Sequence, residues 1–175
     1  MNKENIHIDL DENVIHFISK NTKENEDKIS EYITDIVYIG CEENNVTSDN
    51  IFISITSATK EEIRKINNEY RNIDRATDVL SFPIFEKEEL EKIKLQDEEK
   101  RLKEIELGDI ILCLDVIEEQ AKEYETGILR ETLYMITHGV CHLLGYDHIE
   151  ENDKKEMRIM EEKILQKIGV SKDEE

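Results

Sequence analysis

The sequence predicts an α+β fold: a single domain over residues 1–175, in which about five helices pack on a mixed sheet of about four strands. The length is that of one ordinary domain. Short segments rich in β-branched residues alternate with segments in which apolar residues recur every three or four positions, as in strands separated by helices. Ile, Leu, Val and Phe make up 50 of the 175 residues, enough for a core although 38% of the chain is charged.

The first half of the chain should form two strands and two helices. Residues 6–10 alternate apolar and polar side chains, which indicates a half-buried strand. Apolar residues at helical spacing predict a helix over 26–43 that closes near Gly40. Residues 51–57 are mostly β-branched or aromatic, which favours a second strand, and a capping-box pattern after it predicts a helix over 60–70.

The second half should add two strands and three helices. Residues 78–84 read as a strand whose Pro83 places it at a sheet edge, and the nearly continuous apolar run 107–114 predicts a central strand. The segment 86–106 between them consists mostly of Glu, Lys, Asp and Arg, which we interpret as a charged insertion, either a solvated helix or a mobile segment. The three helices are expected at 115–125, 128–144 and 151–168.

The chain is strongly acidic, with 23 basic and 43 acidic residues and a formal net charge of −20. Such a charge repels polyanions at long range, so composition alone argues against nucleic acid as a ligand. The longest apolar run, 110–114, is far shorter than the roughly 18 residues that span a bilayer, and the acidic N-terminal segment is unlike a signal peptide. We therefore expect a cytoplasmic protein with no membrane partner, in which three cysteines are reduced core residues: Cys41, Cys113 and Cys141.

The residues that carry chemistry are three closely spaced histidines. His138 and His142 lie one turn apart on one expected helix, on the side opposite its main apolar face. Imidazoles at this spacing can direct their ring nitrogens at one metal ion, and Gly145 can end the helix so that the chain turns and returns His148 to the pair. Three neutral nitrogen ligands leave one position of a tetrahedral zinc ion open, as in catalytic zinc sites.

Three neighbours of the histidines bear on this interpretation. Cys141 lies between the first two histidines, but its angular offset favours packing over a role as a fourth ligand. Asp147 either orients a ligand ring or is an exposed loop acid. The histidine spacing matches the long zinc signature of the metzincin proteases, except that Gly139 stands where those enzymes place a glutamate as general base.

The segment from His138 to His148, His-Gly-x-x-His-Leu-x-Gly-x-Asp-His, resembles the signature of the YbeY family of bacterial endoribonucleases. Two further blocks agree with that family in order and spacing: Asn68-Glu-Tyr-Arg71 through Thr77-Asp-Val-Leu-Ser-Phe-Pro83, and Leu107-Gly-Asp-Ile110. The matching region covers roughly residues 51–85 and 107–150.

The resemblance implies an α+β fold, one zinc ion on the three histidines and a catalytic role for Arg71. It also implies cleavage of single-stranded RNA in maturation of the 3′ end of small-subunit (16S) ribosomal RNA and in ribosome quality control. The partners would be ribosomal RNA and the small ribosomal subunit or its assembly factors, not DNA.

Two other functions stay open when only the residues are considered. A zinc metallopeptidase-like hydrolase would share the histidine motif but would need a carboxylate base near the metal. A non-enzymatic ribosome-assembly factor would use a structural zinc ion only to hold the loop that carries His148.

The charge is unevenly distributed, which modifies the argument against RNA. Residues 51–85, which include Arg71, contain five basic and five acidic side chains and are neutral. The other four basic residues of this segment are Lys60, Arg64, Lys65 and Arg75. If these side chains share one face with the metal, they form a local positive groove that binds RNA weakly, selectively and in a salt-sensitive manner.

Overall fold

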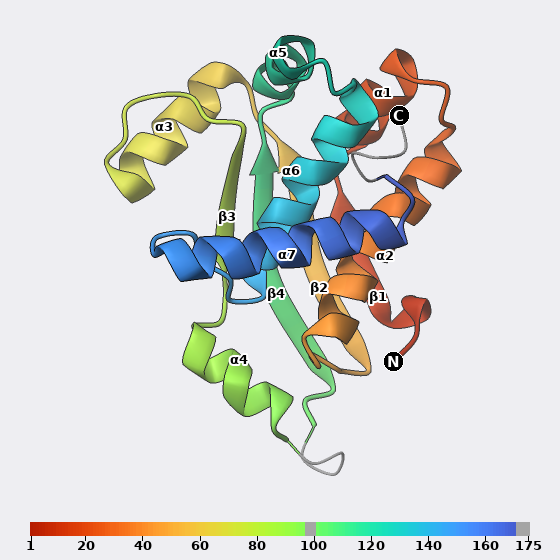
Figure 1. The fold of residues 1–175 in the computed structure, drawn as a ribbon, viewed down its shortest axis with the longest axis vertical. Helices are drawn as coiled ribbons and strands as arrows, with labels where there is room; N and C mark the ends of the chain where they lie inside the picture. The colour runs from red at the N-terminus through yellow and green to blue at the C-terminus, as the bar shows by residue number, and fades with distance from the viewer. Residues whose placement is uncertain (97–100, 171–175) are drawn as a thin grey trace.

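The computed structural model describes residues 1–96 and 101–170 (Figure 1). The strands are β1 (Ile6–Leu10), β2 (Asn50–Ser57), β3 (Val79–Pro83) and β4 (Glu104–Leu112). The α-helices are α1 (Glu12–Asn21), α2 (Glu26–Glu43), α3 (Lys60–Arg71), α4 (Lys87–Lys94), α5 (Leu114–Tyr124), α6 (Ile128–Leu143) and α7 (Glu151–Lys167). A short 3-10 helix, η1 (Lys3–Asn5), precedes β1.

The four strands form one mixed sheet in the order β1-β2-β4-β3, which confirms the predicted α+β class. β1, β2 and β4 are parallel, and β3 runs antiparallel to β4 at the sheet edge, where Pro83 was expected. The register shifts after Phe52, so that Leu107 is an extra residue in β4. Gly108 follows it with φ 134°, and a Cβ there would lie 2.1 Å from the carbonyl oxygen of Phe82. Only glycine fits this close approach.

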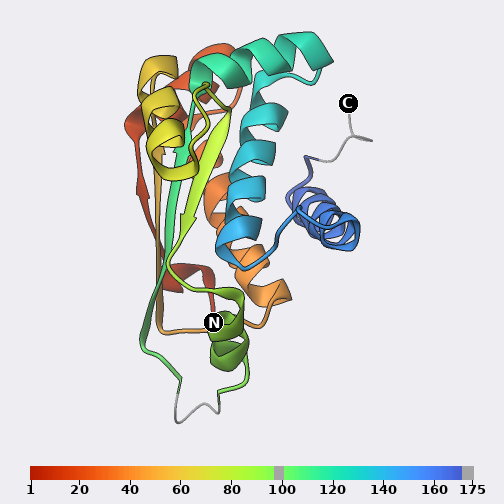
Figure 2. The same ribbon diagram turned by 90° about the vertical axis from the view of Figure 1, so that its left-hand side faces the viewer.

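The helices that build the core lie mainly on one side of the sheet. Figure 2 shows α2 and α6 between the sheet and α7, which crosses outside both. Isoleucines dominate the interior between these layers. A smaller cluster of Ile63, Leu80 and Cys113 joins α3 to β3 and to the end of β4. The three free cysteines are buried, as predicted.

The prediction of about five helices is wrong, because the described residues form seven α-helices. The two additional helices, α1 and α4, are short. α1 does carry a signal in the sequence, because Val14 and Ile18 lie one turn apart and Asp11 caps the helix by accepting a hydrogen bond from the backbone N–H of Asn13. α4 has a single buried residue, Leu90.

The charged segment 86–106 contains a largely exposed helix, as one of its two interpretations expected, but its ends also belong to the packed domain. Its first part is α4, whose Leu90 is fully buried and lies against Gly145 in the loop after α6. Its last residues belong to β4, which begins at Glu104 because Ile105 and Leu107 alternate inward. Residues 97–100 lie outside the described part of the chain.

The predicted helix over 26–43 is confirmed as α2, but Gly40 lies inside it and does not end it: Gly40 faces Val140 and Leu144 and serves close helix packing. One predicted boundary differs from the structure. β4 ends at Leu112, before the predicted position 114. Among the described residues, no helix is both long and apolar enough to cross a membrane.

The contact between α6 and β4 depends on Gly139. A Cβ at this position would lie 2.7 Å from Cδ1 of Ile110 and 3.0 Å from both of its γ carbons. Real carbon atoms do not approach so closely, and Ile110 is itself fully buried. The absence of a side chain therefore lets the helix lie directly on the sheet.

We predict that Gly139→Ala lowers the free energy of unfolding by about 1–3 kcal/mol, because overpacking outweighs the gain in helix propensity. Urea denaturation followed by circular dichroism measures this change. Gly40→Ala is the comparison, since a Cβ there meets Cδ1 of Leu144 and Cγ1 of Val140 at the longer distances of 3.0 and 3.2 Å. If Gly139→Ala lowers the free energy of unfolding no more than Gly40→Ala does, the proposed contact is contradicted.

Candidate metal centre

Helix α6 places His138 and His142 on one side, as their spacing predicts. The two Nε2 atoms are 3.2 Å apart, and both side chains are half-buried. Helix α6 ends at Leu143, and Gly145 follows with φ 91°, a conformation that L side chains rarely adopt. The backbone N–H of Tyr146 donates to the carbonyl of Cys141, which turns the chain back over the helix end.

This turn brings His148 to the other two histidines. Its ring centroid lies 5.6 Å from that of His138 and 4.9 Å from that of His142. One ring nitrogen from each of the three residues lies within 4.8 Å of the others, so the group could hold a metal ion. His148 is exposed, so the open side of this group faces the surface.

Hydrogen bonds orient the two helical histidines for metal binding. Nδ1 of His138 lies 2.7 Å from Oε1 of Glu161, and Nδ1 of His142 lies 3.0 Å from the carbonyl oxygen of Tyr146. Each partner is an acceptor that favours a proton on Nδ1, which leaves Nε2 unprotonated. The unprotonated nitrogens are those that converge, so the donor set fits a divalent metal ion that prefers imidazole.

The surroundings also keep these groups in the required protonation states. Burial, followed by the adjacent His138 ring, which disfavours a second positive charge, lowers the pKa of His142 to about 4, so the His142 ring is neutral near pH 7. Burial, together with the charge of Glu161, raises the pKa of Tyr134 to about 12. The Tyr134 hydroxyl therefore stays protonated and donates to the second oxygen of Glu161 at 3.3 Å.

Sequence reasoning missed Glu161, the hydrogen-bond partner of His138. It lies on α7, 23 positions after His138, and is only 3% exposed. A signal for it does exist, because Glu161 interrupts the buried stripe of α7 between Met157 and Ile164. A carboxylate in an apolar stripe needs a partner, and here the partner is a predicted metal ligand.

The structure decides between the alternatives for two neighbours. Cys141 is fully buried in the core, and burial raises the pKa of its thiol well above the usual value, so it packs rather than binds metal. Asp147 is exposed and accepts hydrogen bonds from the backbone N–H groups of His148 and Ile149. It therefore stabilises the loop backbone and is an exposed loop acid.

Arg71 lies at the C-terminal end of α3, beside the edge strand β3. Its terminal nitrogen donates to the carbonyl oxygen of Ser81 at 3.3 Å, and the residue is exposed. Its positive charge contributes, as the smallest cause, to the lowered pKa of His142. The guanidinium is therefore within electrostatic range of the histidine group.

Three of the other four basic residues in 51–85 do not contribute to the expected positive groove. Lys60 pairs with Glu119, Arg64 with Asp74, and Lys65 with Glu61. These pairs neutralise the cations at the surface, so they add little positive potential. Within the described part of the chain, Arg71 and Arg75 form no ion pair.

Comparison with known proteins decides the family. The family model described as Endoribonuclease YbeY matches residues 14–169. The chain belongs to the YbeY family. A member from Finegoldia magna named Endoribonuclease YbeY is 43% identical over 135 residues, which cover 77% of this chain and 80% of the relative. A member with the same name from Clostridium botulinum (strain Kyoto / Type A2) is 43% identical over 172 residues, 94% of this chain and 98% of the relative.

A solved structure shows the same overall fold. The solution structure of TM1509 from Thermotoga maritima matches with a TM-score of 0.56 and 24% identity. The match covers 93% of this chain and 88% of that one. At this identity it bears on the fold alone.

We predict that Glu161→Ala weakens Zn²⁺ binding by about 10- to 100-fold, because His138 loses the acceptor that fixes its ring. Glu161→Gln keeps an acceptor without the charge and should weaken binding less. Competition with a chromophoric chelator measures the affinity, and circular dichroism verifies folding. The control is Glu162→Gln, whose carboxylate lies near Arg130 instead. Equal affinity of Glu161→Ala and the control would refute the orienting role.

Proposed function

We propose that this chain cleaves single-stranded RNA with one zinc ion held by His138, His142 and His148. The observation that carries the proposal is the convergence of three histidine nitrogens within 4.8 Å in a member of the YbeY family. The endoribonuclease class follows from the family and from relatives of 41–46% identity that bear that name. Zinc is proposed because three neutral imidazoles and an open position suit it.

The mechanism assigns separate tasks to the residues of this chain. A bound zinc ion would supply Lewis-acid chemistry, polarising a phosphate oxygen or lowering the pKa of a water molecule. Glu161 and the Tyr146 carbonyl hold the two helical imidazoles in place. When the RNA 2′-hydroxyl or a water attacks phosphorus, a new P–O bond forms while the bond to the leaving ribose oxygen breaks; the nucleophile loses a proton to solvent and the leaving oxygen gains one. Negative charge develops on the nonbridging oxygens during this step, and Arg71 would stabilise it bidentately.

We further propose that the RNA is ribosomal. The motif blocks that resemble the YbeY family support maturation of the 3′ end of 16S ribosomal RNA and ribosome quality control in the cytoplasm. The partners would then be the small ribosomal subunit or its assembly factors. A net charge of −20 favours selective encounters with such partners over binding to arbitrary RNA.

A peptidase mechanism is less well supported by the geometry. Metzincin peptidases place their general base directly after the first histidine, which is the position of Gly139 here. A side chain at that position would collide with the buried Ile110 of β4, so the packing of α6 on the sheet leaves no room for a glutamate there. Digestion of casein that stops on addition of a chelator would favour the peptidase instead.

We predict that Arg71→Ala retains its zinc but cleaves RNA at least about 100-fold more slowly, because the charge on phosphorus is no longer stabilised. Cleavage of a labelled single-stranded RNA and elemental analysis measure the two properties. Arg64→Ala is the matched control, since Arg64 lies on the same helix and pairs with Asp74 at the surface. Unchanged cleavage by Arg71→Ala would end its proposed role.

Metal removal gives a separate test. A chelator should abolish cleavage and zinc should restore it, whereas His142→Ala should lose both metal and activity. This variant, purified in parallel, also measures contaminating ribonuclease. If it cleaves RNA as fast as the wild type, the chain is better described as a non-enzymatic assembly factor, which should still bind ribosomal subunits. Full zinc occupancy in His142→Ala would contradict the ligand assignment.

A further inference from the structure

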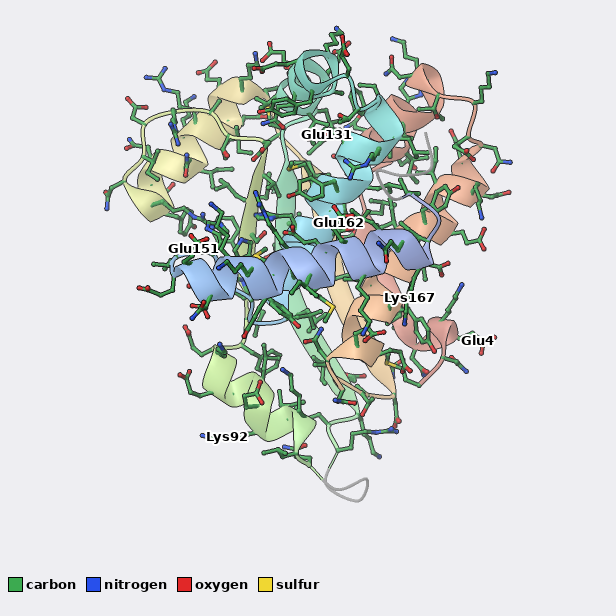
Figure 3. All side chains as sticks on the ribbon, in the orientation of Figure 1. Glu4, Lys92, Glu131, Glu151, Glu162 and Lys167 are labelled. Atoms are coloured by element: carbon green, nitrogen blue, oxygen red, sulfur yellow. The ribbon has the colours of Figure 1, made fainter. Side chains whose placement is uncertain are left out.

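A cavity of about 460 Å³ lies beside the metal centre, between the end of α5, the first half of α6 and α7. Figure 3 labels Glu131 on α6 and Glu162 on α7, which belong to its two helical walls. The cavity shares Tyr134 and Glu161 with the hydrogen-bond network of His138. A ligand bound in it would therefore be a close neighbour of a group reacting at the three histidines.

Buried polar atoms without partners are concentrated in this cavity. Among the described residues, four buried side-chain nitrogen or oxygen atoms have no hydrogen-bond partner, and three of them belong to lining residues: Gln120 Oε1, Arg130 Nε and Arg130 Nη2. The Arg130 side chain is only 6% exposed, and Oε1 of Glu162 is 3.7 Å from Nη2, too far for a hydrogen bond. Unpaired buried donors are costly, so they favour a ligand that offers acceptors.

The cavity also offers hydrogen-bond acceptors. Asp78 accepts from the side-chain amide of Gln120 at 2.9 Å, and Glu131 accepts from the hydroxyl of Thr126 at 2.8 Å. Both carboxylates line the same space as Arg130. A ligand with donors and acceptors along one edge matches this lining, and an aromatic base has such an edge.

Two exposed side chains complete the lining. Arg158 is exposed on α7 and forms no ion pair among the described residues, although acidic residues outnumber basic ones by 43 to 23. Tyr124, at the end of α5, is 58% exposed. An unpaired guanidinium suits a phosphate, and an exposed aromatic ring suits the face of an unstacked base.

We propose that this cavity binds one nucleotide of single-stranded RNA next to the bond that is cleaved. Arg158 contacts its phosphate, Tyr124 stacks on the base, and Arg130 with Gln120 hydrogen-bonds the base edge. The volume lies within the range of small-molecule sites. This assignment rests on the proposed endoribonuclease function and deepens it, because it names a second contact region besides Arg71 and the metal.

Fluorescence anisotropy with the zinc-loaded protein tests the assignment. The probe is a labelled single-stranded 2′-O-methyl oligouridylate of about twelve nucleotides, verified as intact on a gel after each titration. Arg158→Gln should raise Kd about tenfold and lower the slope of log Kd against log salt by about 0.7, the value for one phosphate contact. Lys92→Gln removes the same charge on α4, remote from the cavity (Figure 3), and should change neither quantity.

A second variant separates stacking from charge. Tyr124→Ala should also raise Kd by about tenfold, but should leave the salt slope unchanged because no charge is removed. Both substituted side chains are exposed, so folding should be retained.

The possible outcomes distinguish this assignment from the proposed function. Wild-type affinity of both Arg158→Gln and Tyr124→Ala, in a protein whose wild type cleaves RNA, would overturn the nucleotide site alone. Weakened binding by both, in a protein that does not cleave RNA, would support the site and overturn the endoribonuclease proposal.

Discussion

The burial of α6 on two opposite sides is the constraint on which the metal centre depends. On one side, Gly139 lets the helix lie directly on Ile110 of β4. On the other side, α7 covers the helix and would leave His138 without a polar partner if Glu161 were absent. Because a half-buried imidazole packed against a helix needs an acceptor for its N–H, the same carboxylate that makes this packing possible also fixes the ring in the orientation that a metal ion would require.

The acidity of the chain and its proposed RNA substrate are compatible because charge is neutralised locally. Most basic side chains near the sequence motif pair with carboxylates at the surface, as Lys60 does with Glu119. Three arginines lack such pairs among the described residues: Arg71 at the end of α3, Arg75 in the loop after it and Arg158 on α7. An RNA strand would be attracted where such unpaired cations are exposed, and the predominantly acidic remaining surface would repel it.

The number of buried residues does not by itself decide which elements could be predicted from the sequence. The four strands and the helices α2, α3, α5, α6 and α7 were predicted, α3 from its capping box although Ile63 is its one buried apolar residue. Helix α1 was missed, although Val14 and Ile18 lie one turn apart. Helix α4 was interpreted as part of a charged insertion, although its single buried residue, Leu90, lies against Gly145. One buried leucine among charged residues is indistinguishable from a solvated segment until its neighbour in space is known.

Some residues of the candidate site could likewise be predicted from the sequence, and others could not. The sequence by itself determined the three histidines, the glycine that returns the chain, and the missing base at Gly139, because these depend on spacing within one helix and one turn. Only the tertiary structure decided that Glu161 supports His138, that Lys60, Arg64 and Lys65 are neutralised, and that Arg158 lines a cavity beside the metal centre. These contacts join α6 to α7 and α3 to its neighbours. The pitch of a helix fixes the spacing of residues that share one face, but the packing of separate elements fixes no spacing in the sequence.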